Sequence, residues 1–215
     1  LRERLNFDWI CDARVDRVSS DVLKAMARAG CKVIFYGIES ASQRILDYYN
    51  KGITPRQAAD AVRKAREAGI DVVVGSFVLG APIETREEME ATMRFAKRLD
   101  IDLPVFRILE LHPGTPIWAE LAASGVLDED RYWEAGAYAP EVCGGPVSMA
   151  EVCSIIKRGF ASYVLRPSYV AVQLWRSIKS RYRSGVIAAN LRKLRDMSIS
   201  LDEICEIPAK YRGAA

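Results

Sequence analysis

The sequence predicts an α/β fold, in which parallel strands alternate with helices to form a partial (β/α) barrel. Four apolar segments of strand length are separated by segments with helical spacing of apolar residues, as in parallel βαβ units. A helix that ends on Ala-Gly just before a buried strand occurs twice, at Ala29-Gly30 and at Ala68-Gly69. Four strands are about half of an eight-stranded barrel, or most of an open six-stranded one.

The first strand and helix are predicted at the N-terminal end. Trp9–Val15 has the length and composition of a short strand. Ser19 or Ser20 can cap a helix whose apolar residues recur at helical spacing, and Gly30 ends that helix. Cys31–Ile38 is the next apolar strand.

Two helix starts follow the second strand. Ser40–Gln43 has the spacing of a capping box, which predicts a helix that Gly52 ends. Thr54–Gln57 combines a capping Thr, a Pro at the first helical position and a Gln at the third, and Gly69 ends the helix that it begins.

The stretch Asp71–Thr85 organises the predicted fold. A continuous apolar run reads as a strand buried on both faces, and it passes through Gly75 and Gly80. Thr85–Glu88 is a capping box that starts a helix reaching Leu99. Ligands of parallel α/β folds bind at the carboxyl ends of the strands, and a glycine there indicates close backbone approach.

The remaining elements complete a division into three parts. Leu103–Leu111 is a fourth strand, and Thr115-Pro116 starts a helix that ends near Gly125. We therefore assign residues 1–127 to the barrel and residues 128–150, which are irregular, to a connector or lid that shapes the substrate entrance.

The last part, residues 151–215, is predicted to be a basic helical extension. Ser148–Leu165 and Ser168–Leu194 read as two helices, broken at Pro167, and the last twenty residues read as loosely organised. Residues 151–215 carry 12 Lys+Arg against 5 Asp+Glu, although the whole chain has a net charge of only +3. This excess indicates either a solvated helical face or a patch for a phosphate, a nucleic acid or a membrane surface.

Composition fits an ordinary globular protein in a reducing compartment. No apolar stretch approaches the ~20 residues that a membrane span needs, and no signal peptide opens the chain. The five cysteines are odd in number and form no CxxC, which argues against a disulfide framework and favours a cytoplasmic setting. They also provide no cysteine-ligated cluster within these 215 residues.

The N-terminal end predicts that part of the fold lies upstream. The chain opens at Leu1 without a Met. A parallel sheet whose edge strand is Trp9–Val15 would also expose a long apolar edge. We expect further N-terminal strands to precede this chain in a longer protein.

Charged residues near the strand ends are the first candidates for a site. Glu39 could accept ribose hydroxyls or a ligand ammonium, or could act only in the first turn of a helix. Arg14 is either a carboxylate clamp or part of a surface ion pair. Arg107 lies inside an apolar strand and needs a partner, which could be a substrate anion or a structural carboxylate. His112, the only histidine, is a weaker substrate candidate that could equally be structural, and no metal site can be assembled around it from the scattered cysteines.

The central strand offers the second set of candidates. The backbone from Ser76 to Gly80 could lie against a flat ring such as adenine. The alternative is that Gly75 and Gly80 serve only tight packing and a turn.

Four segments together resemble the radical S-adenosylmethionine (radical SAM) superfamily, and most closely the class that often carries a cobalamin-binding domain upstream. They occur in family order over roughly residues 9–127: CDARVDRVSSDVLKAMARAGC, FYGIESASQRILDYYNKGITPRQAADAVRKAREAGI, GSFVLGAPIETREEMEATMRFAKRLD and LHPGTPIWAELAASGVL. The segment FASYVLRPSYV resembles the helical extension of that class.

The resemblance implies a barrel of six strands, S-adenosylmethionine as cofactor and a [4Fe-4S] cluster held by a CxxxCxxC loop. It also implies reductive cleavage to a 5′-deoxyadenosyl radical, or methyl transfer through cobalamin in some members. By matching positions, Glu39 and Ser40 would contact the ribose or methionine part, and Arg14 the methionine carboxylate. The strand end from Gly75 to Gly80 would lie along the adenine, with Ile108 nearby.

Because the CxxxCxxC loop is not in this sequence, we expect the chain to be the C-terminal portion of such an enzyme and inactive alone. Its partners would be the upstream half of the same polypeptide and a small-molecule substrate, with cluster and cobalamin ligands outside the chain. The alternatives are a barrel-derived binding module that has lost the chemistry, or a tRNA-modifying relative. Nucleic acid is the less favoured partner, because no aromatic-studded β-domain is evident.

Overall fold

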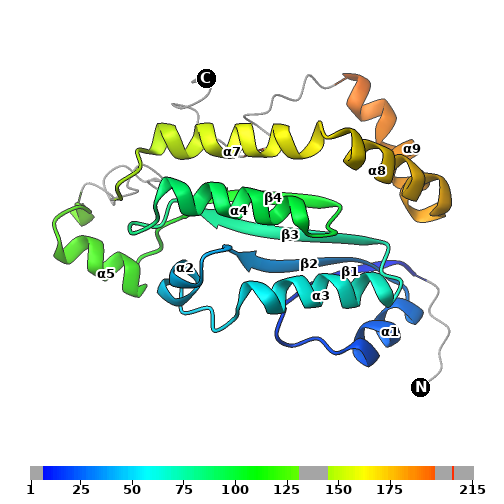
Figure 1. The fold of residues 1–215 in the computed structure, drawn as a ribbon, viewed down its shortest axis with the longest axis horizontal. Coiled ribbons are helices and arrows are strands. Elements are labelled where there is room, and N and C mark those ends of the chain that lie inside the picture. The colour runs from blue at the N-terminus through cyan, green and yellow to red at the C-terminus, as the bar shows by residue number, and fades with distance from the viewer. Residues whose placement is uncertain (1–6, 131–144, 197–204, 206–215) are drawn as a thin grey trace.

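The computed structural model describes residues 7–130, 145–196 and 205, and its centre is a four-stranded parallel sheet (Figure 1). The strands lie in chain order, β1-β2-β3-β4, and all three neighbouring pairs are parallel. This confirms the predicted α/β fold with four parallel strands of a partial barrel. The strands are β1 (Trp9–Ala13), β2 (Cys31–Glu39), β3 (Val72–Leu79) and β4 (Leu103–Ile108).

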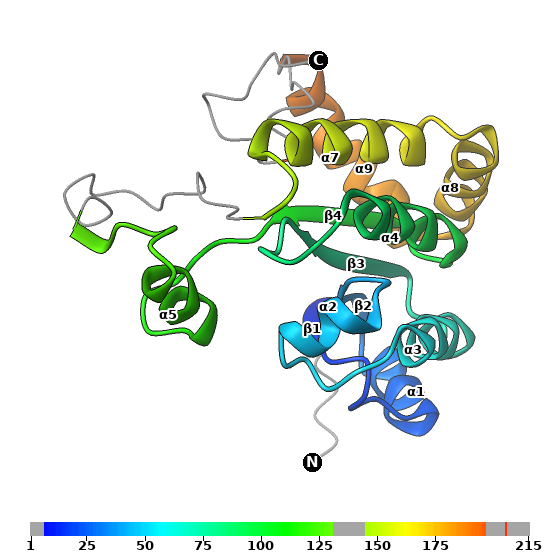
Figure 2. The same cartoon turned by 60° about the vertical axis from the view of Figure 1, so that its left-hand side comes forward.

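Helices connect the strands and cover one face of the sheet. α1, α3 and α4 pack on β2 and β3, and α7 packs on β4. Figure 2 shows α5 standing away from the sheet, and its buried residues form a small hydrophobic cluster separate from the main core. The connecting helices are α1 (Ser20–Arg28), α2 (Gln43–Tyr48), α3 (Pro55–Glu67), α4 (Arg86–Arg98) and α5 (Pro116–Ala123).

The helix-covered face of the sheet forms the main core. Ile34, Tyr36 and Ile38 alternate along β2 and are fully buried, and Phe77 and Leu79 of β3 lie beside them. The residues between them point to the opposite face of the sheet. At the carboxyl ends of the strands, none of the described connecting helices covers this face. This alternation gives the sheet one packed face and one accessible face.

Most predicted helix starts are confirmed by the capping bonds. Ser19 caps α1, and Thr115 caps α5. Both Thr54 and Thr85 form complete capping boxes, in which the side chain at the third position bonds back to the capping amide. Each bond satisfies an amide that the first helical turn leaves without a partner.

Three predicted boundaries were wrong. The capping residue of α2 is Ser42, whose hydroxyl accepts from the amide of Ile45, so the box predicted at Ser40 does not form. β1 ends at Ala13 rather than Val15. β4 ends at Ile108 rather than Leu111, because the segment beyond it leaves the sheet toward α5.

The C-terminal region contains three described helices rather than two: α7 (Met149–Val164), α8 (Pro167–Lys179) and α9 (Arg181–Asp196). Pro167 begins α8 at a position where its missing amide costs nothing, and the helix predicted at Ser168–Leu194 breaks at Ser180. Buried residues of α7 belong to the same core as the strands. Most of the connector predicted at residues 128–150, and most of the last twenty residues, lie outside the described residues. None of the described helices combines the length and the apolar character needed to cross a bilayer.

Candidate functional site

A cavity of about 460 Å³ opens on the accessible face of the sheet, toward the carboxyl ends of the strands. All four strands contribute to it, and one lysine comes from the loop after α2. Its position is the one at which parallel α/β folds bind ligands. The lining residues are Asp12, Ala13, Arg14, Phe35, Tyr36, Gly37, Lys51, Ser76, Val105 and Arg107.

The floor of the cavity is a row of residues in register across three strands. Gly37 of β2 pairs with Ser76 of β3, and Ser76 pairs with Val105 of β4. Ser76, a predicted site residue, therefore lies in the middle of the cavity floor and is half-buried. The missing side chain at Gly37 leaves space for the ends of the Glu39 and Lys51 side chains above the floor.

Glu39 ends β2 in a strained conformation beside this floor. Its φ is 64°, in the left-handed region that a non-glycine residue seldom occupies, and the β2–β3 register shifts between Gly37 and Glu39. The Glu39 carboxylate accepts a 2.5 Å hydrogen bond from Lys51 Nζ. Such strain persists where the surrounding contacts over-determine it, which is characteristic of functional sites.

Arg14 follows β1 and lies at the rim of the cavity. Its Nε and Nη2 donate to the two carboxylate oxygens of Asp16 at 2.9 and 3.1 Å, and Nη2 also donates to the carbonyl of Lys51 at 2.9 Å. The guanidinium lowers the pKa of the Asp16 carboxyl through this hydrogen bond. Arg14, Lys51 and Glu39 are thereby tied together at one edge of the cavity.

Arg107 is also in the cavity lining, on the accessible face of β4. The predicted substrate candidate His112 is not, because it lies beyond the end of β4. His112 Nε2 is 3.8 Å from Glu110 Oε2, and its carbonyl accepts from the hydroxyl of Thr115, the α5 cap. The site candidates that the structure brings together in the cavity lining are therefore Arg14, Ser76 and Arg107, whereas Glu39 is not in the lining and lies at its edge through the bond to Lys51.

Ser40 is separated from the cavity by burial. Its side chain is completely buried, and its hydroxyl lies 3.2 Å from the hydroxyl of Thr92 in α4. It also accepts from the amide of Ser42 at 3.1 Å. The Ser40 hydroxyl thus ties the β2–α2 loop to α4, so any contact with a ligand would have to come from its backbone.

Two further predicted residues face the core rather than the cavity. A Cβ on Gly75 would lie 3.0 Å from the side chains of both Ile38 and Ile101. Ile108 packs against the main core and is absent from the cavity lining. The packing explanation for Gly75 is the one that the structure supports.

Gly80 forms a turn around Glu84, a residue that the sequence analysis missed. Gly80 has a φ of 91°, and its amide donates to Glu84 Oε2 at 2.8 Å. The amide of Ala81 donates to the same oxygen, whereas Glu84 Oε1 has no hydrogen-bond partner among the described residues. Burial raises the pKa of Glu84 to about 7. The available signal was a carboxylate four residues after a strand-ending glycine.

Lys51 was also missed, because nothing in the loop Tyr49–Ile53 marks it as different from a solvated lysine. Only the folded structure shows that Lys51 lies at the end of β2, where it donates to Glu39.

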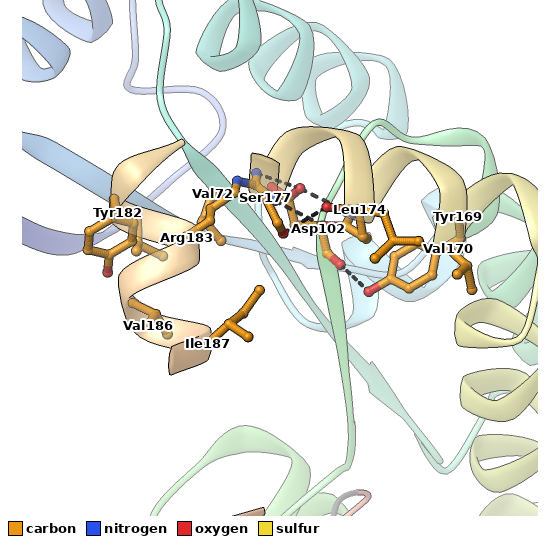
Figure 3. A pocket seen from close by; sticks show the side chains of 12 residues that line it. Val72, Asp102, Tyr169, Val170, Leu174, Ser177, Tyr182, Arg183, Val186 and Ile187 are labelled. Carbon is orange, nitrogen blue, oxygen red and sulfur yellow. Dashed lines mark hydrogen bonds and ion pairs between the residues drawn. The ribbon is translucent and has the colours of Figure 1, made fainter. Parts of the chain in front are cut away.

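A second, largely apolar groove of about 490 Å³ lies at the opposite ends of the strands (Figure 3). It is formed by β2, β3, α8 and α9, and the ion pairs of Asp102 close one side of it. Asp102 accepts from Arg66, Arg176, Arg183, Gln173 and the amide of Val73. This buried carboxylate joins α3 and the start of β4 to the two C-terminal helices.

The described residues do not fit an iron–sulfur cluster. No three His, Cys, Asp or Glu side chains among them are arranged to hold a metal ion. Cys11 and Cys31 approach each other, with 4.0 Å between their sulfurs. Burial raises the pKa of both of these thiols, which keeps them protonated.

Comparison with known proteins gives a consistent relationship. Residues 3–96 match the family model of the radical SAM superfamily. An uncharacterized methyltransferase of Pyrococcus horikoshii is 39% identical over 166 residues, which are 77% of this chain and 36% of the relative. Bacteriochlorophyllide d C-8(2)-methyltransferase of Chlorobaculum tepidum is 32% identical over 114 residues, or 52% of this chain and 25% of the relative.

A solved structure is similar to about half of this chain. The radical S-adenosylmethionine methyltransferase TsrM from Kitasatospora setae, solved with cobalamin and a [4Fe-4S] cluster bound, matches with a TM-score of 0.50 and 25% identity. The match covers 54% of this chain and 23% of that one. The chain thus spans about a third or less of the proteins that it matches. Its strand order, its family-model match and its relatives together show that the chain belongs to the radical SAM superfamily.

Proposed function

We propose that this chain is the C-terminal part of a radical SAM methyltransferase and that its cavity at the strand ends binds S-adenosylmethionine. The proposal rests on one observation: Arg14, Lys51 and Ser76 line one cavity at the carboxyl ends of parallel strands, and Lys51 holds the Glu39 carboxylate at its edge. A zwitterionic ligand with a ribose needs this combination of cations, a carboxylate and a hydroxyl.

The residues present fit the cofactor in kind. Arg14 would bind the methionine carboxylate, and Glu39 would accept from the ribose hydroxyls or the methionine ammonium. Ser76 would offer a hydroxyl from the cavity floor, next to Gly37, where the ends of the Glu39 and Lys51 side chains occupy the place of a side chain. Lys51 would be a positioning residue, because it holds the Glu39 carboxylate beside the cavity.

The iron–sulfur cluster would be held by residues outside the described part of this chain. None of its described cysteines fits that role. When bound, the cluster supplies the electron that cleaves S-adenosylmethionine. We assign the cluster ligands, and those of any cobalamin, to a part of the protein upstream of Leu1. The four strands here and the roughly twofold greater length of the relatives support this division.

Methyl transfer is the favoured reaction because two relatives are named as methyltransferases and the matching solved structure is one as well. Arg107, on the opposite side of the cavity floor from Arg14, would contact the substrate. The cavity excludes water from one side of the reacting atoms, and the cofactor supplies the chemistry.

The test uses the longer protein, purified without oxygen. The coding sequence upstream of Leu1 should contain a CxxxCxxC. The intact protein should bind S-adenosylmethionine in calorimetry, and Glu39→Gln should weaken that binding about tenfold, or ~1.4 kcal/mol. Glu67→Gln, an exposed substitution on α3, is the matched control and should leave binding unchanged.

Two results would contradict the proposal at different points. An unchanged affinity of Glu39→Gln for S-adenosylmethionine would mean that the cavity is not the cofactor site. A reading frame that starts at Leu1, with ligand binding but no 5′-deoxyadenosine or methylated product, would favour a binding module that has lost the chemistry.

A further inference from the structure

Helix α8 packs on the barrel through its polar side. Tyr169 donates to the carbonyl of Asp102 at 2.8 Å, and Gln173 donates to its carboxylate at 3.2 Å. Arg176 donates to Asp102 at 3.0 Å and forms a bidentate pair with Asp100. The polar residues of α8 therefore face the protein, which reverses the usual arrangement of a surface helix.

The outer side of α8 is apolar and exposed. Val172, Trp175 and Ile178 recur every three residues, and Leu165 lies just before the helix. The exposed fractions are 41%, 59% and 81% for the three helical residues and 76% for Leu165. We call these four residues the α8 stripe. Figures 1 and 2 show α8 at the edge of the molecule, and no described segment covers the stripe.

The groove of Figure 3 is a different surface. It lies between the helices and the sheet, where Val170 and Leu174 of α8 face Val186 and Ile187 of α9. The stripe residues are not part of the groove lining. α8 therefore has an apolar surface beyond the one that its own fold uses.

The stripe lies in a strongly basic segment. Residues 165–196 contain eight Lys and Arg but only one acidic residue, Asp196. Asp100 and Asp102 neutralise part of this charge through Arg176 and Arg183. Lys179 lies beside the stripe, with its ammonium 4.0 Å from the centre of the Trp175 ring, and Arg181 is exposed at the start of α9.

We propose that the α8 stripe inserts into the surface of a membrane that contains anionic lipids. An exposed row of Trp, Ile, Val and Leu buries its apolar groups at the level of the lipid headgroups, and flanking Lys and Arg contact the phosphates. Trp and Lys are both suited to this boundary, because each combines an apolar body with a polar end. The protein would bind from one side as a peripheral protein.

The combination of apolar and basic residues favours an anionic membrane over a nucleic acid or a second copy of the chain. A nucleic acid would attract the cations but would gain nothing from a row of exposed aliphatic side chains. A second copy would bring two basic segments together, which costs free energy through repulsion. An anionic bilayer is the partner that uses both the stripe and the excess of cations.

The experiment measures binding of the intact protein to vesicles by co-sedimentation. Vesicles of phosphatidylcholine containing about a quarter phosphatidylglycerol should bind it, whereas phosphatidylcholine alone should bind it at least about tenfold more weakly. Binding should fall at about 0.5 M salt, because the Debye length contracts to a few ångströms. Quenching of the Trp175 fluorescence by brominated lipid should report insertion.

Two pairs of variants separate the apolar and charged contributions. The double variant Trp175→Gln/Ile178→Gln should lose roughly tenfold or more in vesicle affinity. Val22→Gln, at an apolar position on α1 that is 50% exposed, should not change the vesicle affinity. Lys179→Glu should weaken binding to anionic vesicles, whereas Lys24→Glu on α1 should have no effect of that size.

Each other partner would overturn the proposal through its own result. If another part of the polypeptide covers the stripe, Trp175 will be shielded from an aqueous quencher before any lipid is added. If a second copy covers it, Trp175→Gln/Ile178→Gln will lower the mass in solution without affecting vesicle binding. Equal binding to neutral and anionic vesicles, or unchanged vesicle binding in the double variant, would also exclude insertion of the α8 stripe into an anionic membrane. Circular dichroism of each variant separates loss of folding from loss of binding.

Discussion

Lys51 Nζ lies 2.5 Å from Glu39 Oε1, directly above Gly37 on the cavity side of β2. A Cβ on Gly37 would lie 2.7 Å from that carboxylate oxygen and 3.1 Å from the lysine nitrogen. The ion pair therefore occupies the space that any side chain at position 37 would take. The glycine serves the site rather than the backbone, because its φ is not in the left-handed region.

Gly37→Ala should therefore impair ligand binding more than folding. The methyl group displaces the ends of two side chains that can move, so the free energy of unfolding should change by about 1 kcal/mol or less. The affinity for S-adenosylmethionine should fall about tenfold or more, which is ~1.4 kcal/mol. Calorimetry and chemical denaturation of the intact protein measure the two effects.

Gly185→Ala is the control for a glycine without such neighbours. The residue is in α9, and a Cβ there meets no atom of the described part of the chain within 4 Å outside its own helix backbone. It should leave ligand affinity unchanged. If Gly37→Ala binds like Gly185→Ala, the Glu39–Lys51 pair does not contribute to the site.

Glu84 should make the stability depend on pH in the direction opposite to most carboxylates. Burial raises its pKa from 4.5 to about 7 in the folded protein. The folded state then holds a proton that the unfolded state releases between these two pH values. Its contribution is fully present below pH 4.5 and is lost as the pH rises to about 7, by an amount on the order of 3 kcal/mol.

The variant Glu84→Gln isolates this contribution. Glutamine retains an oxygen that accepts from the amides of Gly80 and Ala81 and does not ionise. The free energy of unfolding of wild type minus that of the variant should fall between pH 5 and 8, as measured by urea denaturation. A difference that stays constant over this range would mean that Glu84 has an ordinary pKa.

Asp102 should be among the most sensitive positions outside the cavity. Its carboxylate is buried and is paired with Arg66, Arg176 and Arg183. Asp102→Asn leaves buried guanidinium groups without their counter-charge, which should cost about 3–5 kcal/mol in the free energy of unfolding.

Asp100→Asn provides the comparison two residues away. Asp100 also pairs with Arg176, but its side chain is 55% exposed, so its loss should cost about 1 kcal/mol or less. Urea denaturation of the two variants should separate them clearly. Equal effects would mean that burial of the Asp102 network adds nothing to stability.

The fold was largely predictable because its local signals agree with its tertiary structure. The Thr-x-x-Gln and Thr-x-x-Glu boxes at Thr54 and Thr85 determine where α3 and α4 begin. Gly30 and Gly69, both with positive φ, follow the ends of α1 and α3. The capping role predicted for Ser40 was wrong because a distant contact uses its side chain. Its hydroxyl forms a hydrogen bond with the hydroxyl of Thr92, which lies 52 residues further along the chain. No local sequence pattern predicts that contact.

The break between α8 and α9 also depends on a distant contact. Ser180 is neither Gly nor Pro, so the local sequence does not mark the boundary. Arg183 reaches Asp102, 81 residues earlier in the chain, and that bond is made because α9 turns back over the sheet.

The site was less predictable because parallel strands are apolar on both faces. The sequence therefore does not tell which of two neighbouring residues faces the ligand. Ser76 and Arg107 line the cavity, whereas their neighbours Gly75 and Ile108 face the core. A charged or hydroxyl side chain inside such a strand was the better indicator of the cavity face.

Gly75→Ala tests that assignment of faces. Its Cβ would lie 3.0 Å from Ile38 and Ile101 and 3.2 Å from Phe77, all of them buried in the core. Because these side chains are held in place by their own neighbours, the added methyl should destabilise the protein by roughly 1–3 kcal/mol. The affinity of the folded protein for S-adenosylmethionine should stay within about threefold of wild type, which is ~0.7 kcal/mol of binding free energy.

Ser76→Ala should give the reverse pattern, because the adjacent residue points to the cavity. Its removal leaves the core intact, so the free energy of unfolding should change by about 0.5 kcal/mol or less. Ligand affinity should fall, because a hydroxyl is lost from the cavity floor. If instead Gly75→Ala weakens ligand binding without destabilising the fold, the backbone at Gly75 contacts the ligand directly. The two faces of β3 would then have to be reassigned.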